Sequence, residues 1–158
     1  MIRRISLALV AVIVMVTAAQ AQLKVMTEFR GMNFGADLSE IQHMVPEDSR
    51  GAIRFFKKYA DDKTFQGIAL KELHYGFVEN KFALVLFNAQ GPSAFNTLKA
   101  YFDTTYGQPH QPSKGVKQYT YGAGDVSIEM GYDDTRKVCE VSYIYRPLMS
   151  KLGGPKKQ

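Results

Sequence analysis

Polar and apolar residues alternate with a period of two along several segments of this chain. In LKELHYGFV (residues 70–78), apolar side chains at every second position are separated by polar or small ones, and DVSIEMGY (125–132) and VCEVSYIYR (138–146) repeat the pattern. This period is typical of a β-strand with one buried face. The segment KFALVLF (81–87) is apolar on both faces, so we expect it to be the most central strand in this half of the chain, joined to the preceding one by a tight turn at Glu79-Asn80.

The clearest helical pattern lies in GPSAFNTLKAYFDTTYGQP (residues 91–109). Phe95, Leu98 and Phe102 recur at helical spacing and are expected to dominate the docking of this helix. Proline fits the first turn of a helix, and Gly107 stands where a left-handed cap belongs. The pattern therefore predicts a helix that ends just before Gly107.

A second, shorter helix is predicted from residue 38 to residue 45. Asp37 and Glu40 form a capping pair, and Pro46 would stop the helix after two turns. Gly31 and Gly35 lie just before it and give the backbone freedom to turn from a strand into the helix. A phosphate-binding loop would need more glycines at fixed places, so we interpret this stretch as a structural joint.

The order of these elements predicts one α+β domain over residues 22–150. After a loose edge strand at 23–29, each half of the chain has a helix followed by three strands. The first set of strands begins at AIRFFKKY (52–59), for which a helix is the alternative, and the second at VKQYTY (116–121), the weakest pattern of the set. We expect antiparallel sheet with two helices on one face. The repeated order also suggests tandem αβββ units, although the halves share no sequence identity.

The first 21 residues have the parts of a secretory signal peptide. Arg3 and Arg4 precede an apolar run from residue 5 to residue 16, and Ala19 and Ala21 form a small-residue cleavage site. A membrane anchor is the alternative, but the run is shorter than the roughly 20 apolar residues that span a bilayer. We therefore expect cleavage after Ala21, a mature chain without a membrane span, and a periplasmic or secreted location.

The charge of the folded part is balanced, in contrast to the basic whole chain. Five of the twenty lysines and arginines lie in the leader or in the tail SKLGGPKKQ (150–158), whose last residues, 151–158, we expect to be disordered. Residues 22–150 therefore carry fifteen basic and fifteen acidic residues. Without a cationic cluster, the sequence does not favour nucleic-acid binding.

The sequence predicts no catalytic residue, no cofactor and no metal site. His43, His74 and His110 are widely spaced, and neither an H-E-x-x-H nor a C-x-x-C motif is present. Cys139 alternates with apolar residues and is interpreted as a small core residue. As the single cysteine, it also cannot form an intrachain disulfide.

Tyrosines concentrate on the last three predicted strands. Tyrosine is enriched at protein interfaces because it combines an apolar ring with a hydroxyl. We take Tyr119 and Tyr121 as candidates for a partner surface, and the alternative is that they line the rim of the core.

Four segments together resemble a group of small exported bacterial proteins of uncharacterised function: FRGMNFGADLSEI, YGFVENKFALVLF, FNTLKAYFDTTYGQP and DVSIEMGYDD. The shared pattern has F-R-G-x-x-W-G before a short helix, a G-F-x-x-x-K-F hairpin, and a helix ending in K-Y-G-x-P. This chain departs from it at Phe34, where the group has tryptophan, and at Thr105, where lysine is common. The resemblance implies no catalytic residues. A looser likeness is to the tandem helix-and-sheet architecture of β-lactamase-inhibitor-like proteins.

These observations favour a non-catalytic exported domain that binds a protein or an envelope component. The alternative is a small-ligand binder with a pocket between helix and sheet. An enzyme is the third hypothesis, and no recognisable catalytic constellation supports it.

Overall fold

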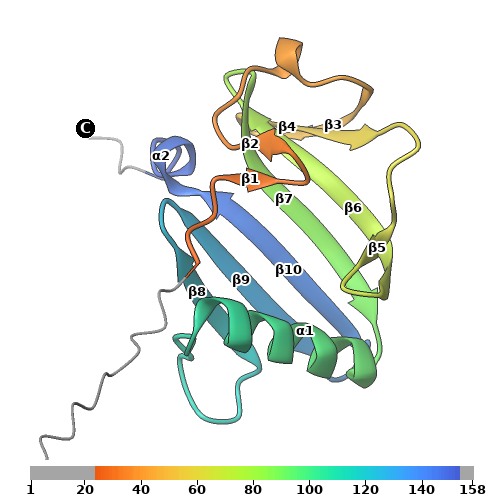
Figure 1. Ribbon diagram of the computed structural model, residues 1–158, viewed down its shortest axis with the longest axis vertical. Coiled ribbons are helices and arrows are strands. Elements are labelled where there is room, and N and C mark those ends of the chain that lie inside the picture. The colour runs from red at the N-terminus through yellow and green to blue at the C-terminus, as the bar shows by residue number, and fades with distance from the viewer. Residues whose placement is uncertain (1–23, 154–158) are drawn as a thin grey trace, which may run out of the picture.

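The computed structural model describes residues 24–153, which form one large antiparallel sheet with a helix across one face (Figure 1). The strand order is β3-β4-β6-β7-β10-β9-β8, and β5 pairs with β6 outside this path. The strands are β3 (Met44–Arg50), β4 (Ile53–Lys58), β5 (Thr64–Phe65), β6 (Ile68–Val78), β7 (Lys81–Gln90), β8 (Gln118–Ala123), β9 (Val126–Asp133) and β10 (Val138–Tyr145). The predicted α+β class with antiparallel sheet is confirmed. The predicted leader at 1–21 and residues 154–158 of the tail lie outside the described residues.

Two meanders build the sheet and meet at β7 and β10. The first runs through β4, β6 and β7, and the second returns through β8, β9 and β10, so that β10 pairs antiparallel with β7. The β6–β7 turn lies at Glu79 and Asn80, whose φ angles of 50° and 61° are those of the predicted tight hairpin. Strand β7 lies in the middle of the order. Its residues 82–85 are buried on both faces, as the apolar sequence predicted, whereas Leu86 and Asn88 are half-buried.

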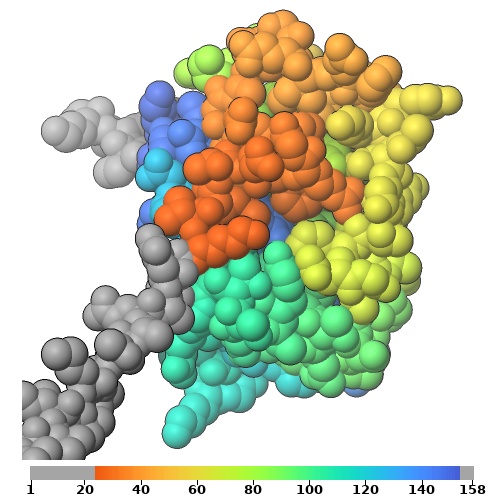
Figure 2. All heavy atoms as spheres, viewed as in Figure 1, coloured from red at the N-terminus to blue at the C-terminus, as the bar shows by residue number. Residues whose placement is uncertain are grey.

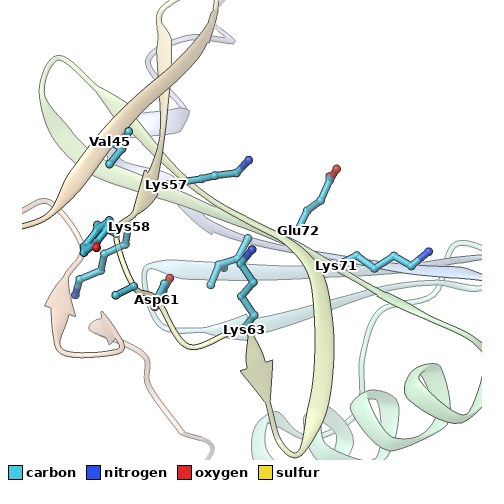
Figure 3. A pocket seen from close by; sticks show the side chains of 10 residues that line it. Val45, Lys57, Lys58, Asp61, Lys63, Lys71 and Glu72 are labelled. Atoms are coloured by element: carbon cyan, nitrogen blue, oxygen red, sulfur yellow. The ribbon is translucent and has the colours of Figure 1, made fainter.

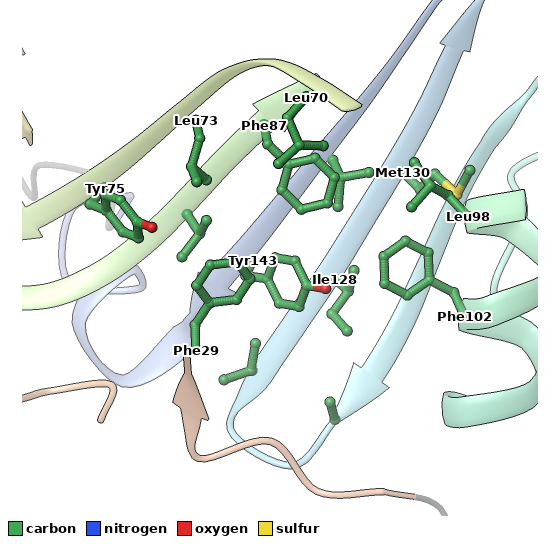
Figure 4. Close-up of a cluster of buried hydrophobic side chains, with 14 of the residues drawn as sticks. Phe29, Leu70, Leu73, Tyr75, Phe87, Leu98, Phe102, Ile128, Met130 and Tyr143 are labelled. Atoms are coloured by element: carbon green, nitrogen blue, oxygen red, sulfur yellow. The ribbon is translucent and has the colours of Figure 1, made fainter. Parts of the chain in front are cut away.

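Helix α1 (Pro92–Tyr106) packs across the apolar face of this sheet, and its predicted bounds are confirmed. Leu98 and Phe102 have no exposed surface, whereas Phe95 is only half-buried and packs on Tyr132. Figure 4 shows Phe102 pointing from α1 toward the side chains of the last three strands. Its ring centroid lies 5.6 Å from that of Tyr121, so the helix docks through an aromatic layer.

The N-terminal hairpin covers the rest of the apolar face. Strands β1 (Glu28–Phe29) and β2 (Met32–Asn33) pair with each other, and in Figure 2 this segment lies beside α1. Phe29 is buried against Tyr143, and Phe34 stacks on Phe82 with centroids 4.8 Å apart. Gly35, with φ of 86°, then donates its N–H to the Phe82 carbonyl. The glycine-containing stretch is thus structural, as expected, although it forms a hairpin.

Arg30, at the tip of this hairpin, ties it to the loop between β4 and β5. Its guanidinium donates to Asp61 Oδ1 at 3.2 Å and to the carbonyl oxygens of Asp62 and Thr64. The other oxygen of Asp61 accepts from the Tyr75 hydroxyl at 2.5 Å. One carboxylate therefore joins the hairpin to the central part of the sheet.

The prediction of a two-turn helix over residues 38–45 is wrong. Only a 3-10 helix, η1 (Leu38–Glu40), forms there, with Asp37 accepting from the Ser39 N–H as its cap. The backbone is already extended at Ile41. Residues 44–50 then pair with β4, because an isolated helix of two turns is marginal and strand pairing gains more hydrogen bonds. Pro46 lies in this edge strand, where a missing N–H is tolerated.

A short helix that the sequence did not predict, α2 (Arg146–Met149), follows β10. Its Leu148 packs with Val78 and Ala83. Successive side chains of a strand point to opposite faces of the sheet. Because Phe82 faces the α1 side, the adjacent Ala83 faces away from it, and α2 covers one end of that opposite face. The expected pair of helices on one face is therefore replaced by α1 and the N-terminal hairpin. Within residues 24–153, the helices lack the length and apolar character needed to cross a bilayer.

We expect Phe102→Ala to lower the free energy of unfolding by about 3–5 kcal/mol, since it leaves a cavity under α1. Urea denaturation of the purified protein measures this loss, with Phe95→Ala as the control. Because Phe95 is half-buried, its truncation should cost less. Equal losses for the two variants would contradict the packing described here.

Cys139 provides a second test, because burial raises the pKa of its thiol from 9.0 to about 12. The unfolded chain ionises this thiol at a lower pH than the folded chain does. Its contribution to stability is thus complete below pH 9.0 and decreases as the pH rises toward about 12. Between pH 8 and 10.5, the free energy of unfolding should fall more steeply for the wild type than for Cys139→Ala. Parallel pH profiles for the two proteins would refute this assignment.

Candidate functional site

The face of the sheet opposite α1 carries polar side chains in transverse rows. The strand register aligns two such rows from β6 to β8. The first contains Glu72, Asn88, Glu140, Gly131 and Gln118, and the second contains His74, Leu86, Ser142, Glu129 and Thr120. All of these residues are exposed or half-buried, whereas their neighbours along each strand are mostly buried. We call this two-row surface the open face.

The open face is acidic. Its two rows contain three glutamates and no lysine or arginine. Arg136, in the β9–β10 turn, reaches Glu140 at 3.2 Å, and its main partner is Asp133 at 2.7 Å. Because the folded part of the chain is neutral overall, this concentration of carboxylates is a local property of the face.

Two shallow hollows lie along the open face. One, of about 250 Å³, is lined by residues that include Glu72, His74 and Asn88, and by the basic side chain of Arg50 from β3. The other, of about 330 Å³, lies toward β8 and includes Glu129. Glu140 and Ser142 line both hollows, so the two hollows adjoin each other across the middle of the sheet.

A chain of polar contacts borders the open face at β3 and β4. Glu47 accepts from Lys57 Nζ and pairs with His74 Nδ1, each at 2.6 Å, and His74 Nε2 lies 3.6 Å from Glu72. Burial raises the pKa of Glu47, but hydrogen bonds from Lys57 and His74 outweigh this effect and hold the pKa below its ordinary value. Glu47 is therefore ionised at neutral pH and fixes the orientation of the His74 ring.

The surroundings of His74 decide what this cluster can do. A nucleophile activated by a histidine needs a hydroxyl or thiol within hydrogen-bond reach of the ring. In the part of the chain that the structure describes, the polar partners of the ring nitrogens are both carboxylates, although Ser142 lines the same hollow. Cys139 is fully buried among core residues. The contacts of His74 therefore orient its ring between two carboxylates and do not activate a nucleophile.

The structure separates the two tyrosines proposed as a partner surface. Tyr121 is buried, and its hydroxyl donates to Asp103 Oδ1 at 2.8 Å, so its side chain belongs to the core under α1. Burial, followed by this hydrogen bond, raises its pKa well above the ordinary value. Tyr119 is half-buried beside Phe95, and Lys99 Nζ lies 4.5 Å from its ring centroid. A surface built from both rings is therefore not formed, and a partner contact by Tyr119 stays a prediction.

The other candidate residues occupy structural positions. His43 lies in a turn with φ of 66°, and the backbone of exposed His110 pairs with Thr120 on the outer edge of β8. Among residues 24–153, no group of three or more histidine, cysteine or acidic side chains is placed to hold a metal ion.

The alternative site, a ligand pocket between helix and sheet, is limited to the margin of α1, where Lys99, Asp103 and Tyr119 help to line a hollow of about 370 Å³. The layer directly under the helix is filled. Leu98 and Phe102 lie there with no exposed surface, and Ile128 and Met130 pack against them from β9 (Figure 4). A ligand would have to displace this core, so the layer under α1 is less suited to binding than the open face.

Comparison of the chain with protein-family models, with curated proteins and with solved structures gave no match. The resemblance to small exported bacterial proteins therefore stays a prediction. The assignment of a function depends on the geometry of the chain itself.

Proposed function

We propose that this chain is a non-catalytic binding protein of the cell envelope, and that its open face binds a protein partner through basic side chains. The observation that carries the proposal is the exposed pair of rows with Glu72, Glu129 and Glu140 and without a lysine or arginine. Carboxylates arranged on one surface select a partner of opposite charge and speed its approach. The envelope location follows from the predicted signal peptide.

The backbone supports such a role because it presents the carboxylates from a rigid platform. Strands β6, β7, β10, β9 and β8 are hydrogen-bonded to their neighbours along their length. At about 4.8 Å per strand, these five strands give a surface roughly 20 Å wide, enough for several partner side chains. Because the backbone of these strands is already ordered, it loses little freedom on binding, which lowers the entropic cost of association.

Non-catalytic binding is favoured over an enzyme by the contacts of His74. The ring lies between Glu47 and Glu72, and the neighbouring side chains of the hollow supply polar groups without an activated nucleophile. Such an arrangement suits recognition of cationic groups by oriented carboxylates.

The experiment compares partner capture by two charge-matched variants. The chain starting at Gln22 is immobilised and exposed to the envelope fraction of its source cells, and captured proteins are quantified by mass spectrometry. We expect Glu72→Gln/Glu129→Gln/Glu140→Gln to reduce capture of the partner by about tenfold or more, because each lost pair to a desolvated charge costs on the order of 1 kcal/mol. Raising the salt concentration should release the partner from the wild type.

The control variant is Glu28→Gln/Glu40→Gln/Asp125→Asn, which removes the same charge from exposed sites away from the open face. It should capture the partner as the wild type does. Undiminished capture by the open-face variant, or equal loss in both variants, would refute the proposal.

A further inference from the structure

A hollow beside strands β4 and β6 and the loop that leads to β5 adjoins the open face at Glu72, which lines both (Figure 3). It encloses about 490 Å³. The lining side chains include four lysines, two carboxylates and three large apolar groups: Lys57, Lys58, Lys63, Lys71, Asp61, Glu72, Val45, Tyr59 and Leu73. We call it the lysine hollow.

The charge of the lysine hollow is not internally compensated. Lys57 forms an ion pair with Glu47, and Asp61 accepts hydrogen bonds from Arg30 and Tyr75. The charges of Lys57 and Asp61 are therefore already compensated by these partners. Within the described part of the chain, no carboxylate lies within 4.0 Å of the amino groups of the other three lysines, Lys58, Lys63 and Lys71. Glu72 is the remaining anion, and it lies beside His74. The hollow therefore keeps a net positive charge in a protein whose folded part is neutral.

Apolar groups adjoin these cations. Val45 is 46% exposed and Tyr59 is 74% exposed, and they are two of the five large apolar residues that are exposed in the described part of the chain. Leu73, which is buried, forms part of the wall of the hollow. Exposure of a valine and a tyrosine beside unpaired lysines marks a surface that gains from contact with an anion carrying an apolar part.

We propose that the lysine hollow binds a phosphate-bearing amphiphile, with the phosphate held by Lys58, Lys63 and Lys71 and the apolar part against Val45 and Tyr59. Lysine binds phosphate as a mobile point charge, and its long stem lets three amino groups from different elements adjust to one anion. In Figure 3, Lys63 rises into the hollow from the loop before β5, while the stems of Lys58, from β4, and Lys71, from β6, extend to opposite sides of it. Binding of one phosphate by all three lysines therefore requires the stems of Lys58 and Lys71 to turn inward. An anionic phospholipid supplies both the phosphate and the apolar part, and a free phosphate supplies only the first.

The test measures binding of two soluble probes by isothermal titration calorimetry: dihexanoyl phosphatidylglycerol below its micellar concentration, and inorganic phosphate. Lys58→Gln/Lys63→Gln/Lys71→Gln should weaken binding of the lipid by about tenfold or more, since the variant removes the three positive charges that attract the phosphate. All three residues are exposed or half-buried surface positions, so the variant should remain folded. Its circular dichroism and thermal midpoint verify this.

The matched control, Lys24→Gln/Lys114→Gln/Lys151→Gln, removes the same charge from exposed sites outside the hollow and should bind the lipid within about twofold of the wild type. Tyr59→Ser should weaken binding of the lipid and leave the weaker binding of inorganic phosphate unchanged.

Three results would overturn the proposal. The first is failure of the wild type to bind either probe at millimolar concentration. The second is equal weakening by the hollow and control variants, which would mean a response to net charge alone. The third is that inorganic phosphate binds as tightly as the lipid and that Tyr59→Ser changes neither affinity. This result would mean that the hollow binds an anion and that the apolar part of the ligand contributes nothing.

Discussion

The pleat of the central strands is the constraint on which the rest of this structure depends. Successive side chains of a strand point to opposite faces, so each of β6, β8, β9 and β10 can bury one set of residues and expose the other. In β10, Val141 and Tyr143 are buried under α1 and the N-terminal hairpin, while Glu140 is exposed. A slip of one residue in register would bury the glutamates and expose the aromatic layer, so the same alternation fixes both the core and the open face.

Local features of the chain suffice to predict much of this fold. The period-two segments became β6, β9 and β10, the Glu79-Asn80 turn formed its hairpin, and the Gly107 end of α1 lies where the pattern placed it. Each of these depends on residues close together in sequence. The segment from Leu38 to Val45 also satisfies a helical period, but pairing with β4 gains more than two turns of helix, and that competition is decided by distant residues.

The candidate sites are less predictable because they depend on register between strands. His74 meets Glu47 only because β3 pairs with β4 and β4 with β6, and the two residues are 27 positions apart. The alternation in 70–78 correctly placed His74 on the polar face, but without the register it could not supply the partner. Tyr121 shows a similar limit, since the weak pattern of its strand allowed both a partner surface and the rim of the core, and only the packing under α1 places the ring in the core.

The distribution of charge gives this neutral domain two distinct surfaces. Glutamates collect on the rows of β6, β10 and β9, and unpaired lysines collect around the hollow at β4 and β6. Neither concentration is visible in the net charge, because the lysines and glutamates are interspersed along the chain and only the fold sorts them. The open face and the lysine hollow therefore differ in the sign of their charge.

The two-faced character of β10 can be measured directly by thiol labelling in a Cys139→Ala background. Single cysteines are placed at two adjacent positions, Val141→Cys and Ser142→Cys, and their reaction with a small thiol reagent is followed under native conditions. The account predicts that the thiol at 142 reacts at once and that the thiol at 141 reacts only as the protein unfolds. Equal rates at the two positions, or faster labelling at 141, would contradict it.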